Sequence, residues 1–187
     1  MTIKVITTKD GVAVVSPYNR EFVARAKSLA GVWDSTSRTW VFPAEVVGDV
    51  RAALRDVYGE DGTAEAELVR LRVDYHAEAG ARELDQGENV NVVVGGREVA
   101  RVFGRDSGAK LGANIVVRSG HFFSGGSVKN YRIGVAPGTV FDILRMPRPM
   151  AERLLVTNPH ECRIVNDDGS ELEQPAGENV VPFRAEG

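Results

Sequence analysis

The sequence predicts an α+β protein in which a small mixed unit precedes a glycine-rich antiparallel β domain. Three observations support this prediction. The first 60 residues alternate between strand-like and helix-like apolar patterns. From residue 90 onward, short β-branched runs are separated by glycines, which is typical of small antiparallel domains. The chain has 187 residues, 43% of them apolar, which is enough for one ordinary core or two small ones.

The first elements expected are a β-hairpin and a helix. Asp10-Gly11 lies between two apolar runs, which is a strong hairpin signal for residues 2–15. Either Ser16 or Asn19 can cap the helix that follows. Gly31 is expected to end this helix as its C′ residue. The apolar side chains of the helix fall on one stripe, which consists of Phe22, Ala26, Leu29 and Ala30.

A tight strand–turn–strand is expected next, over residues 33–43. It carries one tryptophan on each arm, Trp33 and Trp40, and we expect both to pack in the core because each buries a large apolar surface. Asp34 and Arg38 are expected to pair across the turn. A second amphipathic helix then extends to Tyr58, and an alternating strand covers residues 68–75. Together these elements predict a ββαβαβ unit over residues 1–76.

The second half of the chain divides into three expected parts. Residues 77–89 are small and acidic and are expected to form a linker. Residues 90–170 are expected to form the β-rich basic domain, in which 153–156 and 162–165 close the sheet. Residues 171–187 are expected to form a mobile tail. The other strand candidates are 91–94, 98–103, 114–117, 131–135 and 140–144.

The first unit resembles the HARP domain, a small module named from annealing helicases. The resemblance covers about residues 12–60 and implies a nucleic-acid-related role. No helicase core follows it, so ATP-driven remodelling is not implied. The whole chain also resembles short accessory proteins of phages and plasmids. The residues that show the HARP-like pattern are Phe22, Ala26-Lys27, Gly31, Trp33-Asp34, Thr36, Arg38, Trp40 and Phe42-Pro43.

Composition excludes several classes of protein. No apolar run is long enough to span a bilayer, and the N-terminus has no signal-peptide pattern. The single Cys162 excludes an internal disulfide framework, so a cytoplasmic location is expected. No metal or cofactor site is expected, because the histidines lack ligand spacing. No catalytic arrangement is legible either, so we expect a protein that is not an enzyme.

Charge is unevenly distributed along the chain. Residues 97–153 carry 10 basic and 4 acidic side chains, whereas residues 60–96 carry 3 basic and 9 acidic ones. The basic segment is typical of a nucleic-acid footprint. The alternative is that oppositely charged segments neutralise one another in the folded chain.

Residues 104–112 superficially resemble a phosphate-binding loop. The nucleotide-triphosphatase motif needs adjacent Gly-Lys followed by Ser or Thr, but here Ala109 precedes Lys110 and Leu111 follows it. We therefore exclude that class. A basic loop that contacts phosphate through Arg105 and Lys110 remains one interpretation, and a plain pair of turns is the other.

Residues 118–132 interleave aromatic and basic side chains, a pattern suited to base stacking and phosphate contact on single strands. The alternative is that Phe122 or Phe123 anchors the core. Either Phe123 or Tyr131 is expected to stack on a base. The full set of expected nucleic-acid-binding residues is Lys27, Arg38, Arg101, Arg105, Lys110, Arg118, Phe123, Lys129, Tyr131 and Arg132.

These patterns favour a non-catalytic nucleic-acid-binding accessory protein of a mobile element, with forked or single-stranded DNA as the favoured partner. The alternative is an inhibitor of a host defence complex, of the anti-CRISPR or anti-restriction kind, which grips a host nucleic-acid-binding protein complex. A third interpretation is a protein that assembles into a homo-oligomer. No membrane partner is expected.

Overall fold

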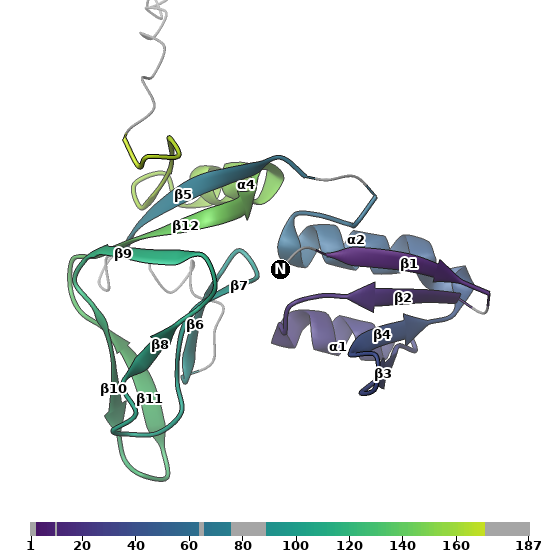
Figure 1. Ribbon diagram of the computed structural model, residues 1–187, viewed down its shortest axis with the longest axis horizontal. Coiled ribbons are helices and arrows are strands. Elements are labelled where there is room, and N and C mark those ends of the chain that lie inside the picture. Colours follow the sequence, from purple (N-terminus) through teal and green to yellow (C-terminus); the bar gives the residue numbers. More distant parts are fainter. Residues whose placement is uncertain (1–2, 10, 64–65, 76–88, 171–187) are drawn as a thin grey trace, which may run out of the picture.

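The computed structural model describes residues 3–9, 11–63, 66–75 and 89–170. Its helices and antiparallel sheets confirm the α+β class (Figure 1). Buried apolar residues form two clusters, one in the N-terminal third and one in the remainder. The expected linker lies outside the described residues except for Asn89, and the expected tail lies entirely outside them.

The N-terminal unit is a four-stranded antiparallel sheet covered on one face by two helices (Figure 1). The strands lie in the order β1-β2-β4-β3. Their alternation sends Val14, Trp40 and Phe42 inward, where they pack against Phe22 and Leu54 of the helices. The elements are β1 (Lys4–Thr8), β2 (Gly11–Val15), α1 (Arg20–Ser28), β3 (Val32–Asp34), β4 (Thr39–Phe42), the 3-10 turn η1 (Ala44–Val46) and α2 (Val47–Tyr58).

The ends of α1 follow from side-chain and backbone chemistry. The Asn19 side chain accepts a hydrogen bond from the Phe22 N–H at 3.0 Å, so Asn19, not Ser16, is the cap. At the other end Ala30 takes the left-handed conformation (φ 57°), and the Gly31 N–H donates to the Ala26 carbonyl at 2.8 Å. The C′ residue is therefore Ala30, and Gly31, which was expected at C′, is the next residue along the chain. A side chain there would collide with the Phe42 ring.

Trp40 is buried as expected, but the prediction for Trp33 is wrong. Trp33 is 47% exposed, because its strand β3 lies at the edge of the sheet; its ring packs against the Trp40 ring, 5.6 Å away centroid to centroid. Asp34 does not bond Arg38. Its carboxylate instead accepts hydrogen bonds from the Thr36 N–H and the Ser37 hydroxyl, which closes the turn locally.

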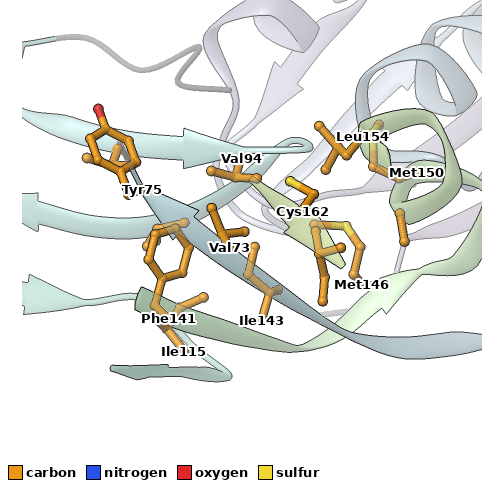
Figure 2. Packing of buried hydrophobic residues seen from close by; sticks show 14 of the residues in the cluster. Val73, Tyr75, Val94, Ile115, Phe141, Ile143, Met146, Met150, Leu154 and Cys162 are labelled. Carbon is orange, nitrogen blue, oxygen red and sulfur yellow. The ribbon is translucent and has the colours of Figure 1, made fainter. Parts of the chain in front are cut away.

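Strand β5 (Leu68–Tyr75) corrects the expected ββαβαβ unit. It pairs with β12 (Thr139–Pro147) and β13 (Cys162–Val165), in a second sheet of order β13-β5-β12-β9, where β9 is Ile115–Ser119. Its apolar face packs Val73 and Tyr75 against Phe141 and Ile143 of β12 (Figure 2). The alternating pattern identified a strand but not its partners, because pairing across a long sequence separation leaves no local signal.

Two smaller sheets complete the second unit. One is β6 (Asn91–Val94), β7 (Arg97–Val102) and β8 (Ala109–Leu111); the other is the hairpin of β10 (Phe122–Gly126) and β11 (Tyr131–Val135). Val94, Phe122 and Ile133 bring both sheets onto the same apolar core as β5 and β12. Strands β8 and β10 were not predicted, because glycines interrupt or flank their short apolar runs.

Residues 153–156, expected as a strand, belong to helix α4 (Arg148–Thr157). Pro149 fits the first turn of the helix, and Met150, Ala151 and Leu154 share one buried stripe at helical spacing. Among the described residues no helix is long and apolar enough to cross a membrane.

The two units meet at the end of α2. Glu60 and Arg97 form an ion pair at 2.8 Å whose side chains are only 4% and 13% exposed. The guanidinium of Arg153 donates to the Asp56 carbonyl at 2.7 Å, where the helix leaves its last carbonyls without internal partners. A side chain at Gly96 would strike the Val57 carbonyl. These contacts connect the N-terminal unit to the second unit.

Candidate nucleic-acid interface

Strands β10 and β11 form a two-stranded ribbon with one inner and one outer face. Phe122 and Ile133 point inward to the core. Cross-strand partners share a face, and Phe123 pairs with Gly134 while Gly125 pairs with Arg132. We call the outward surface the ribbon face; it consists of His121, Phe123, Gly125, Arg132 and Gly134.

Phe123 spreads across the ribbon face. A β-carbon at Gly134 would come to 2.3 Å from the Phe123 ring, so the ring lies directly on the Gly134 backbone. The side chain remains 45% exposed, and the His121 ring lies 5.8 Å away, centroid to centroid. Phe123 is therefore an exposed aromatic surface held in place by its cross-strand neighbour, whereas Phe122 is the core anchor.

The ribbon carries basic side chains and no acidic residues in the surrounding sequence. Residues 107–141 contain no Asp or Glu, although the chain as a whole has more acidic than basic residues. Within the described ranges, Arg132 and Lys129 make no ion pair. Lys129 lies in the turn at the ribbon tip, between Ser127 and Asn130, which bond each other. Both side chains can contact phosphate.

Tyr131 lies on the other face of the ribbon. It pairs with Gly126 and is half-buried, so its orientation is opposite to that of Phe123. The sequence left two candidates for base stacking, and the register places only Phe123 on the ribbon face.

Arg101, Arg105 and Lys110 lie on or beside β7 and β8. Arg101 and Lys110 are cross-strand partners, but the Arg101 guanidinium donates to the Glu98 carboxylate at 2.7 Å. Arg105 pairs with its neighbour Asp106 at 3.0 Å. Lys110 stands over the Phe103 ring, 5.4 Å from its centroid, and this ring is itself exposed. Of these three cations, Lys110 alone has no acidic partner in the described part of the chain.

Arg118 belongs to a different, structural cluster. Its Nε donates to Asp142 at 2.7 Å, and Arg70 and Arg72 bind the same carboxylate, each at 2.7 Å. Asp142 is 0% exposed. Burial raises its pKa, but the bonds from Arg72, Arg118 and Arg70 together outweigh burial and lower the pKa to about 2. Arg118 therefore holds β9 to β12 and β5.

The remaining two expected residues lie in the N-terminal unit. Lys27 is exposed near the end of α1, and Arg38 is exposed in the β3–β4 turn with a left-handed backbone (φ 56°). Figure 1 shows this turn at the opposite side of the molecule from β10 and β11. The structure therefore does not join Lys27 and Arg38 to the ribbon face.

A pocket of about 270 Å³ lies between the two units, and none of the ten expected residues lines it. Its walls include Tyr18 and Ile143, and its charged groups belong to Arg97, Glu98 and Arg145. Phe123, Lys129 and Arg132 instead lie on open surface, which suits an extended ligand better than a small molecule.

Sequence reasoning missed Gly134, which positions Phe123. The available signal was the alternation on both sides of the glycine-rich turn, which predicts that residues 123 and 134 oppose each other once both strands are recognised. Comparisons with protein-family models, with curated proteins and with solved structures gave no significant match.

Proposed function

We propose that this chain binds single-stranded nucleic acid through the ribbon face, as a non-catalytic accessory protein. Phe123 stacks on one base, and Arg132 and Lys129 contact the flanking phosphates. Lys110 is not part of the ribbon face: the Gly108 N–H donates to the Ser124 hydroxyl, which joins the β7–β8 loop to the inner side of β10. The observation that best supports the proposal is the exposed Phe123 ring seated on Gly134.

The geometry favours single strands over duplex. Every base has a face that can stack on an aromatic ring, but in a duplex these faces are already occupied by neighbouring bases. A single strand or the open arm of a fork offers free faces. The HARP-like pattern of the N-terminal unit supports the same class of ligand.

The proposal is tested by fluorescence anisotropy with labelled single-stranded, forked and duplex DNA of equal length. We expect the tightest binding to the single strand and fork, with affinity that falls as salt is raised. Phe123→Ala is expected to weaken binding by about 1–3 kcal/mol, the usual value of one stacked base.

Lys27→Ala is the matched control, because it removes an exposed cation far from the ribbon face. Equal losses for Lys27→Ala and Arg132→Ala would show that binding is only diffuse charge attraction. Absence of binding at low salt would contradict the proposal, and inhibition of a host complex through protein contact would then be the remaining hypothesis.

A further inference from the structure

No helix in the described part of the chain covers the outer face of the N-terminal sheet. α1 and α2 cover its inner face, and none of the outer side chains belongs to either buried cluster. The register brings four aliphatic side chains into one row across all the strands. We call this the outer row; it consists of Ile6, Ala13, Val41 and Val32, in that order.

The outer row is exposed to an unusual degree for β-branched side chains. Ile6 is 50% exposed, Val41 is 39% exposed and Val32 is 67% exposed, and they are contiguous rather than scattered. A contiguous apolar row on a sheet is typical of an interaction surface, because single exposed residues need no explanation but a patch does. The patch is aliphatic and holds no aromatic ring, so it does not suit nucleic-acid bases.

The next row on the same face carries one charged residue at each end, and these charges indicate which partner fits. Lys4 pairs with Val15 on β2, and Thr39 of β4 pairs with Asp34 on β3, so Lys4 and Asp34 lie at opposite ends of the row beside the outer row. Within the described residues neither makes an ion pair. The face therefore carries a positive charge on one edge strand and a negative charge on the other.

We propose that two copies of this chain associate face to face through the outer row. The two-fold axis lies between the two faces, parallel to the strands and midway between β2 and β4. It places each row against the same row of the second copy, in reversed order. It sets Ile6 against Val32 of the second copy, Ala13 against Val41, and Lys4 against Asp34. The face is thus complementary to itself in both apolar contact and charge.

The size of the face sets the strength of the association. β1 and β2 have five residues each, β4 has four and β3 has three. With strands about 4.8 Å apart and about 3.4 Å per residue, the face measures at most roughly 19 Å by 17 Å. The area of such a face, about 320 Å², is smaller than the roughly 800 Å² that each partner buries in a standard interface. The dimer is therefore weak and reversible. It is expected at high protein concentration and not at nanomolar concentration.

Sedimentation equilibrium over a concentration series up to about 1 mM tests the proposal. The wild-type chain is expected to shift from monomer to dimer, and Val41→Lys is expected to remain monomeric. Val156→Lys is the matched control, since Val156 is an exposed valine on α4, outside the row, and this variant is expected to dimerise normally. Circular dichroism confirms that both variants fold.

A charge cycle separates the proposed arrangement from any other dimer. Lys4→Glu is expected to weaken dimerisation at least tenfold, because it faces Asp34 of the second copy. Adding Asp34→Asn, whose amide oxygen can still accept from the Thr36 N–H, removes the repulsion between the two carboxylates and should restore about half of that loss. A monomer throughout, a dimer unaffected by Val41→Lys, or no rescue in the double variant would each overturn the proposal.

Discussion

The Phe123 ring lies on the backbone of Gly134, its partner across the β10–β11 ribbon. The contact exists because residue 134 has no side chain. A β-carbon there would approach the ring to 2.3 Å and force it off the ribbon. Gly134 is therefore a positioning residue for the proposed base-stacking surface, without contacting nucleic acid itself.

Gly134→Ala is expected to weaken binding of a labelled single strand several-fold, although the substitution changes no charge. The displaced ring would lose part of the roughly 1–3 kcal/mol that one stacked base typically contributes. The salt dependence of binding should stay about the same, because no phosphate contact is removed. Combining Gly134→Ala with Phe123→Ala should cost no more than Phe123→Ala alone. Additive losses would show that Gly134 acts independently of the ring.

Arg132→Ala should change the salt dependence of binding as well as its strength. A phosphate contact on a single strand releases about 0.7 counterion, so the slope of log affinity against log salt should become shallower by about that amount. Phe123→Ala should leave the slope unchanged. Anisotropy titrations at four or more salt concentrations measure both, and an unchanged slope for Arg132→Ala would rule out its phosphate contact.

Whether the sequence predicted a structural feature depends on how far apart in the chain the residues that determine it lie. A helix cap at Ser16 or Asn19, the Trp40 strand and the second helix ending at Tyr58 follow from neighbouring residues, and in the structure Asn19 is the cap and both elements are present. The partners of β5 and the edge position of Trp33 depend on pairing between distant segments, which no local pattern records.

The candidate site shows the same division. The aromatic and basic pattern predicted an exposed aromatic at Phe123 or Tyr131 without deciding between them, and it did not distinguish Arg118 from a phosphate ligand. Its role depends on Asp142, Arg70 and Arg72, which come from other strands. A basic residue in a basic segment is thus not evidence of an available charge until its acidic neighbours in the fold are known.

Ala30→Gly is expected to stabilise the protein. Ala30 adopts a left-handed backbone at the end of α1 (φ 57°), which costs an L-residue about 1 kcal/mol and costs glycine almost nothing. We expect a gain of about 0.5–1 kcal/mol in the free energy of unfolding, measured by urea denaturation. Ser28→Gly, in the last helical position, is the matched control and should destabilise. A loss for Ala30→Gly would contradict this account.

Asp142→Asn should be strongly destabilising. It leaves Arg70, Arg72 and Arg118 converging on a neutral group, and loss of one partner from a buried ion pair typically costs about 3–5 kcal/mol. Asp168→Asn, on the neighbouring exposed turn, is the control and should stay close to wild type. Chemical denaturation of both variants at neutral pH gives the comparison.

The same cluster predicts an acid-dependent loss of stability. The folded-state pKa of Asp142 is about 2, below its ordinary value of 3.8, so the folded chain holds this proton less tightly than the unfolded chain. The stabilisation is complete above about pH 4 and is lost as pH falls through about 2, and it amounts to about 2 kcal/mol.

Arg118→Gln removes one of the three bonds that lower the pKa of Asp142, so the pKa of Asp142 should rise. NMR titration of the Asp142 carboxyl and denaturation from pH 5 to pH 2 follow the shift. An unchanged Asp142 titration in Arg118→Gln would show that Arg70 and Arg72 alone hold the carboxylate in its charged form.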